Sequence, residues 1–178
     1  MLALILGLNI KTVSGYPSSA ETGLAMMRGE VDGRGAGYAA MRATQPDWLT
    51  NNRVRILLQL GRTDRHPDLA DVPLARELAT TEEALTMIKL MDSAQIVAWP
   101  FVAPPEVPAD RAAILQKAFM DTQSDLDYIA DAEQRNMELS PISGASVVSL
   151  MGDLTKSVTP TIAARYNAIV AETKEGAK

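Results

Sequence analysis

The residues best suited to chemistry in this 178-residue chain follow Gly15, in the segment IKTVSGYPSSAETGLAMMRGEVDGRG (10–35). Ser18 and Glu21 form an S-x-x-E capping box, which predicts that a helix begins here with Ser18 as its N-cap. The free backbone N–H groups of the first turn, together with the hydroxyls of Ser18 and Ser19, could bind a carboxylate or a phosphate. An ordinary helix cap without a ligand is the alternative interpretation of the same residues.

Other kinds of reactive site have little support. The chain has no cysteine and a single histidine, His66, which excludes thiol nucleophiles, disulfides and the usual cysteine- and histidine-rich metal sites. Because His66 lies in the polar segment RTDRHPDL, we expect a solvated loop residue in preference to a general base. No two carboxylates have the setting of an acid–base pair. We therefore predict no catalytic residue, no metal site and no cofactor.

Composition limits the class of protein. Hydrophobic residues make up 47% of the chain, as in one globular domain or two small ones. The net charge of −5 and the scattered basic residues argue against a nucleic-acid partner. No apolar run approaches the roughly 18 residues that span a bilayer, and the run 2–8 lacks the basic leader and cleavage site of a secretion signal. As written, the chain is expected to stay in the cytoplasm.

The hydrophobic pattern of the first half predicts a βαβαβ arrangement. Strands are expected at three places, which are residues 10–13, 31–35 and 53–60. The apolar run 56–58 fits a strand buried on both faces of a parallel sheet. Helices are expected after Ser18 and over 38–43, and the polar stretch 61–73 is typical of a long surface connection. We accordingly predict an α/β fold with a small, mainly parallel sheet.

The second half is predicted to be predominantly helical. Helices are expected over 74–78, 80–91, 109–121, 124–136, 144–154 and from Pro160 onward, with fraying after Thr173. Residues 96–102 (IVAWPFV) are typical of an extended segment that Pro100 restricts to an edge or crossing strand. Trp99 and Phe101 are expected to pack in a core or between domains.

Several segments occur together in an order typical of one receptor family. They are VSGYP (13–17), Glu21, LAM (24–26), RGEVDG (28–33), ILLQLG (56–61), HPDL (66–69), DVP (71–73) and PPEVPADR (104–111). In this combination the chain resembles the substrate-binding receptors of tripartite tricarboxylate transporters, the Bug family. The resemblance covers nearly the whole chain, and the GY turn, the RGEVDG segment and the PPxxPADR crossover carry most of it.

The resemblance implies a periplasmic, non-enzymatic receptor with two lobes of the type II periplasmic-binding-protein kind. Such a receptor closes over a small organic anion, here a carboxylate, and delivers it to the membrane components of the transporter. It also implies that most of the N-terminal lobe is missing. Residues 1–95 would be the second α/β lobe, and residues 96–178 a crossover strand and the C-terminal helices that normally complete the first lobe. The apolar surface left exposed should favour a homodimer or higher assembly, with or without exchange of C-terminal helices.

The family's second-lobe binding loops correspond to two turns of this chain. They contain Tyr16, Pro17, Ser18 and Ser19 in the first turn, and Gly35, Ala36, Gly37 and Tyr38 in the second. Both turns would lie at the carboxyl ends of parallel strands, where α/β sheets bind ligands. Each tyrosine is expected either to contact the ligand, as a wall or phenolic donor, or simply to pack. Arg34 is the nearest cation, and a solvated side chain is the more frequent state of such an arginine.

Three functions of different classes remain open. The first is a truncated solute-binding receptor for a carboxylate, and the second is a non-binding, oligomerising remnant of such a receptor. The third, which the residues favour least, is a small enzyme that uses Asp or Glu. The identity of the ligand does not follow from the sequence.

Overall fold

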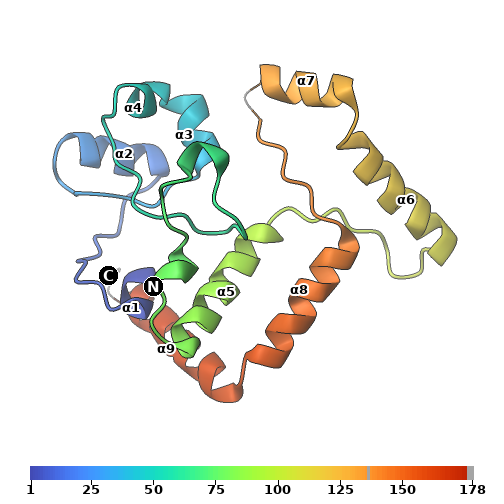
Figure 1. Ribbon diagram of the computed structural model, residues 1–178. Coiled ribbons are helices and arrows are strands. Elements are labelled where there is room, and N and C mark those ends of the chain that lie inside the picture. The colour runs from blue at the N-terminus through green and yellow to red at the C-terminus, as the bar shows by residue number, and fades with distance from the viewer. Residues whose placement is uncertain (136, 176–178) are drawn as a thin grey trace.

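Helices form nearly all the regular structure of the chain. The computed structural model describes residues 1–135 and 137–175. The helices in chain order are α1 (Leu2–Ile5), α2 (Ser19–Met27), α3 (Tyr38–Thr44), α4 (Pro46–Thr50), the 3-10 turns η1 (Pro67–Leu69) and η2 (Ala75–Leu78), α5 (Glu82–Ile96), α6 (Ala109–Thr122), α7 (Leu126–Gln134), α8 (Gly144–Ser157) and α9 (Pro160–Glu175). Figure 1 shows them as a packed body around α5, from which α6 and α7 extend to one side. None of the described helices is long and apolar enough to cross a membrane.

The predicted α/β fold with a parallel sheet is wrong. The structure is 57% helical and 1% strand, and its described residues contain a single isolated bridge, between Gln59 and Leu74. The three predicted strands, at 10–13, 31–35 and 53–60, are irregular chain, and the bridge at Gln59 is their one pairing among the described residues. A strand is stabilised by cross-strand pairs and a buried face, and the Leu57 side chain, predicted to be buried, is 70% exposed. The β-branched residues of these segments therefore favour an extended chain locally, but they do not form a sheet.

The predicted extended segment at 96–102 is also wrong in part. Helix α5 continues to Ile96, five residues beyond its predicted end, and the chain after it is irregular. Trp99 and Phe101 are 92% and 85% exposed, so neither packs in a core. The Phe101 ring does meet that of Phe119 on α6, with 5.0 Å between the ring centroids.

The helices of the second half agree with the prediction within a few residues. The helix predicted to begin at Ser124 is α7, and its N-cap is Asp125, whose carboxylate accepts two backbone N–H groups. The predicted end of this helix, Asn136, lies outside the described residues, as do residues 176–178 of the predicted frayed tail. Helix α9 itself continues to Glu175.

Helix α5 is the centre of the packed body. It packs against α1, α8, α9 and η2. Ile88 of α5 is fully buried, and Leu154 of α8 and Ile169 of α9 are nearly so. Figure 1 shows α8 and α9 flanking α5, with α1 near its start. The polar loops are attached to this packed body, which holds their ends in place.

Side-chain caps set the starts of several helices as the sequence predicts. The Ser18 hydroxyl accepts the backbone N–H of Glu21 at 3.2 Å, which confirms that Ser18 is the N-cap of α2. The Thr81 hydroxyl accepts the N–H of Ala84 at the start of α5 in the same way. Gly15 has a φ of +100°, which confirms that the turn before α2 uses a conformation that favours glycine.

The loop between residues 59 and 78 is held by buried and bidentate polar contacts. The Gln59 amide nitrogen donates to the carbonyls of Leu69 and Val72, and its amide oxygen accepts the His66 N–H. The Arg65 guanidinium holds the Glu77 carboxylate, with a shortest distance of 2.6 Å. The predicted surface connection at 61–73 is therefore an ordered loop with its own hydrogen-bonded interior.

The Arg65–Glu77 contact makes the stability of the chain depend on pH. The hydrogen bond from Arg65, aided by the Leu74 N–H, lowers the pKa of Glu77 below its usual 4.5. Since this pKa is lower in the folded than in the unfolded state, the contribution is complete above pH 4.5 and is lost as the pH falls through the folded-state pKa. We expect Glu77→Gln to lower the melting temperature at neutral pH, with a deficit that vanishes in acid. A deficit of constant size well below pH 4.5 would contradict this assignment.

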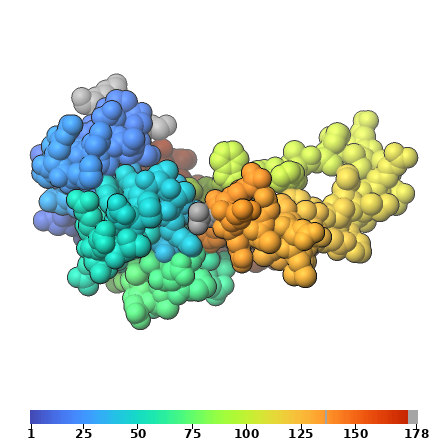
Figure 2. All heavy atoms as spheres, turned by 90° about the horizontal axis from the view of Figure 1, so that it is seen from above, coloured from blue at the N-terminus to red at the C-terminus, as the bar shows by residue number. Residues whose placement is uncertain are grey.

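Residues 97–135, which we call the arm, leave the body after α5. Helix α6 has no buried residue, and α7 buries Ala132 alone. Figure 2 shows the arm projecting sideways from the body. A helix of this length is marginally stable in isolation, because helices in proteins depend on packing of an apolar face. The arm therefore has fewer stabilising packing contacts within one copy of the chain than the helices of the body have.

Candidate functional site

The first predicted binding turn lies on the surface before α2. Pro17, Ser18 and Ser19 are exposed and Tyr16 is partly buried. The Ser18 hydroxyl is occupied by its capping bond to Glu21. Since the described fold has no sheet, the turn does not lie at the carboxyl end of a strand, and that part of the prediction is wrong.

Arg34 joins the first predicted turn to the second. Its guanidinium donates to the Ser19 carbonyl at 2.6 Å and to the Gln45 amide oxygen at 2.9 Å, and it lies over the Trp48 ring at 5.5 Å. The arginine is partly buried and its guanidinium is occupied by internal partners, so the predicted solvated side chain is not what the structure shows. Arg34 therefore links the start of α2 to Gln45 and Trp48 at α4.

The second predicted turn contains the side chain with the clearest chemistry. Gly35, Ala36 and Gly37 are exposed, and Tyr38 begins α3 with its ring partly buried. The Tyr38 hydroxyl donates to Asp68 Oδ2 at 3.3 Å. Arg42, one helical turn later, donates to the same oxygen at 3.2 Å.

Tyr38 and Arg42 therefore converge on one carboxylate oxygen, and we call them the Tyr38–Arg42 pair. The guanidinium also lies 5.9 Å from the centre of the Tyr38 ring. Partial burial, followed by the charge of Asp68, raises the pKa of the Tyr38 phenol, so that it stays protonated as a donor at neutral pH. The Arg42 and Asp68 side chains are 45% and 51% exposed, which leaves the carboxylate accessible from solvent.

His66 lies behind this pair, and its predicted solvation is wrong. The residue is 7% exposed. Its ring meets the Tyr38 ring edge-on at 4.9 Å, and Nδ1 accepts the Asp68 N–H at 3.0 Å. The neutral ring then has its proton on Nε2, which faces Glu138 Oε2 at 3.6 Å. Burial of this kind suits a positioning role, in which His66 orients both the Tyr38 ring and the Asp68 backbone.

Glu138 connects this region to the segment that returns from the arm. Arg62 donates to Glu138 Oε1 at 2.6 Å, so the carboxylate lies between Arg62 and the His66 ring. Neither the burial of His66 nor this ion pair could be read from the sequence. The partners are far apart along the chain, and no pattern links them. The i, i+4 spacing of Tyr38 and Arg42 on one helix face was the available signal for the pair.

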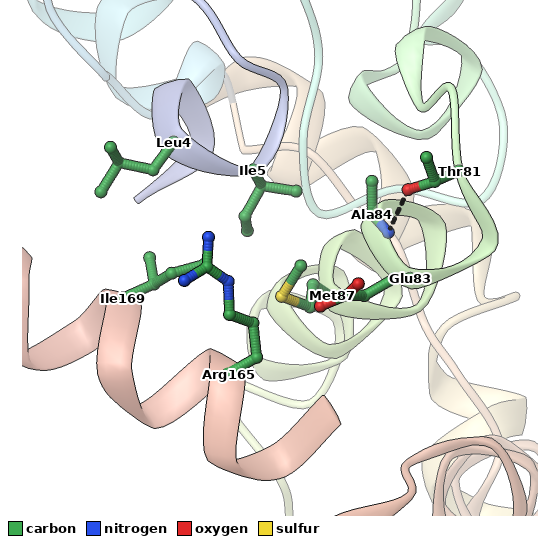
Figure 3. A pocket seen from close by; sticks show the side chains of 8 residues that line it. All are labelled: Leu4, Ile5, Thr81, Glu83, Ala84, Met87, Arg165 and Ile169. Atoms are coloured by element: carbon green, nitrogen blue, oxygen red, sulfur yellow. Dashed lines mark hydrogen bonds between the residues drawn. The ribbon is translucent and has the colours of Figure 1, made fainter. Parts of the chain in front are cut away.

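Two cavities lie elsewhere in the described structure, and each is lined by acidic as well as basic side chains. The first, of about 140 Å³, lies between α1, α5 and α9; Figure 3 shows that Glu83 and Arg165 line it together with apolar side chains of all three helices. The second, of about 370 Å³, lies between α5 and α8. Its lining contains two cations, Lys89 and Arg76, of which Arg76 is paired with Asp92 at 2.6 Å, and a second carboxylate, Asp153, which would repel an anion.

Comparison with known protein families, with curated proteins and with solved structures gives no match for this chain. Its resemblance to tricarboxylate receptors therefore stays a prediction from the quoted segments. The site has to be judged on its geometry. That geometry is one of carboxylate recognition, in which a neutral hydroxyl and a cation point at the same carboxylate oxygen.

Proposed function

We propose that the chain is a non-enzymatic receptor for a small organic carboxylate, bound at the Tyr38–Arg42 pair. The observation that carries this proposal is the convergence of the Tyr38 hydroxyl and the Arg42 guanidinium on Asp68 Oδ2. Asp68 occupies the place that a ligand carboxylate would take. The resemblance to tricarboxylate receptors supports the same ligand class, and a periplasmic place of action with delivery to membrane transporter components belongs to the proposal.

The contacts of Asp68 are suited to displacement. Charge-assisted hydrogen bonds of good geometry measure about 2.7–2.9 Å, whereas the Arg42 contact measures 3.2 Å. Both partners are also about half exposed, and ion pairs in such positions contribute little to stability. A ligand carboxylate can then replace Asp68 at small cost and form shorter bonds to the same two donors.

Replacement of Asp68 tests this proposal. We expect Asp68→Ala to bind citrate on the order of tenfold more tightly than the wild type, because the competing internal carboxylate is gone. Thermal-shift titrations with citrate, tricarballylate and benzoate give the half-saturating concentrations. Asp71→Ala is the matched control, since it removes an exposed charge from the same loop but leaves the pair occupied.

The outcomes distinguish a ligand-binding site from a purely structural contact between Asp68 and the Tyr38–Arg42 pair. A lower half-saturating citrate concentration in Asp68→Ala, with Asp71→Ala equal to the wild type, supports the receptor. No shift with any acid in either Asp68→Ala or the wild type would overturn it. In that case the second candidate gains, a structural and oligomerising chain without a ligand, which the exposed apolar side chains of the arm favour.

A further inference from the structure

The chain exposes far more surface than its mass explains. A folded monomer of 19.2 kDa is expected to expose about 8,400 Å², whereas this chain exposes 12870 Å². The excess of about 4,400 Å² exceeds the roughly 1,000–2,500 Å² that each partner buries in an obligate dimer. One copy therefore exposes enough additional surface to accommodate an interface of the size found in obligate dimers.

The arm exposes several of the large apolar side chains of the described chain. The large apolar side chains that it exposes are Trp99, Phe101, Val102, Ile114, Leu115 and Leu126. Monomeric proteins rarely expose contiguous apolar patches of more than a few hundred Å². Helix α6 has no buried residue in one copy, and α7 buries Ala132 alone, so both helices of the arm leave surface free for contact with another chain.

The body carries a surface that matches the arm in charge. Residues 53–58 form no regular element and bend at Val54, but exposed and partly buried residues alternate along them, which places Arg53, Arg55 and Leu57 on one outer face. All three are exposed, whereas Val54 and Ile56 between them are partly buried. Neither arginine has an ion pair with another described residue. We call this face the basic face.

Helix α7 carries the complementary surface. Leu126 is 81% exposed, and Asp127, Ala130 and Glu133 are exposed beside it at helical spacing. Within the described part of the chain, Asp127 and Glu133 form no ion pair. The arm as a whole contains seven acidic and three basic residues. From Arg53 to Leu57 the chain spans about 13 Å, and from Leu126 to Glu133 about 10 Å, so the two faces are similar in length.

We propose that two copies of this chain form a symmetric dimer, in which α7 of each copy lies against the basic face of the other. Leu126 meets Leu57, and Asp127 and Glu133 meet Arg53 and Arg55. A two-fold interface requires that each chain carry both complementary faces, and this chain does. Each contact then occurs twice in the dimer. The dimer does not depend on the carboxylate site proposed above.

The mass in solution tests this proposal directly. Size-exclusion chromatography with light scattering of the full chain is expected to give twice 19.2 kDa. Leu57→Asp and Leu126→Asp, each on a side chain that one copy leaves exposed, are expected to raise the dimer dissociation constant at least a hundredfold with unchanged helical circular dichroism. Ile10→Asp, which changes an exposed apolar residue on another extended segment, is the matched control and should remain dimeric.

Charge reversal distinguishes this interface from other dimers. We expect the double variant Arg53→Glu/Arg55→Glu to be monomeric, and Asp127→Lys/Glu133→Lys likewise, while the chain with all four changes recovers the dimer. A mass of one copy for the wild type, a larger assembly, or a dimer that ignores all these substitutions would each overturn the proposal. If the fourfold variant is a dimer again, the monomeric state of the two double variants cannot be due to misfolding.

Discussion

Replacement of Asp92 by alanine is expected to destabilise the chain by about 3 kcal/mol or more. The Asp92 side chain is 4% exposed, and it binds the Arg76 guanidinium at 2.6 Å and the Gly61 N–H at 2.6 Å. Removing it leaves a largely buried cation and a backbone donor without a partner. The melting temperature should fall by roughly 10 °C, because 1 kcal/mol corresponds to about 2–4 °C in a domain of this size.

Two further variants show whether the effect comes from the buried charge. Asp92→Asn can still accept the Gly61 N–H but has no charge for Arg76, so it should lose an intermediate amount of stability. Asp153→Ala removes a 74% exposed carboxylate of α8, which lies 3.8 Å from Lys156, and should change the free energy of unfolding by less than about 0.5 kcal/mol. Equal effects of Asp92→Ala and Asp153→Ala would contradict the role of the buried pair.

The substitution Gly61→Ala is expected to cost about 2–4 kcal/mol for two separate reasons. Gly61 has a φ of +80°, which L-residues other than glycine rarely adopt. A Cβ at this position would also lie 2.6 Å from Cβ of Gln95 on α5, a contact that requires the loop or the helix to move. Chemical denaturation with a linear extrapolation measures the difference.

Gly29→Ala separates the backbone cost from the clash. Gly29 ends α2 with a φ of +74°, and a Cβ there would meet nothing within 4 Å. Gly29→Ala should therefore lower the free energy of unfolding only by the cost of the positive φ, about 1–2 kcal/mol. If Gly29→Ala proves as costly as Gly61→Ala, the close approach of the loop to α5 is not what requires glycine at position 61. Because Gly61 and Asp92 share a hydrogen bond, their effects should not add in a double variant.

The sequence was sufficient to predict features that depend on neighbouring residues. The Ser18 cap, the helix after Pro108 and the helix after Ser143 follow from local capping and periodicity, and the structure confirms them. The sheet failed because a strand requires a partner that local pattern does not supply. The side chains of residues 53–58 alternate as in a strand, but the chain forms no ladder there.

In the candidate site, too, contacts between residues distant in sequence could not be predicted. The resemblance to the receptor family predicts Tyr38 as a ligand residue, and in the structure its phenol donates to a carboxylate of the same chain. The carboxylate belongs to Asp68, 30 residues away, and no local signal joins the two. His66 was expected in solvent because its neighbours are polar, but its ring contacts Tyr38, Asp68 and Glu138, and its backbone N–H donates to Gln59.

Calorimetric titration of citrate into the wild type and into Arg42→Gln is the most direct test of carboxylate binding at the Tyr38–Arg42 pair. Arg42 is 45% exposed in its side chain, so the substitution should leave the fold intact. The account predicts saturable heat for the wild type and at least tenfold weaker binding for Arg42→Gln, since a charge-assisted hydrogen bond is lost. Equal binding by the two proteins, or no heat from either, would contradict it.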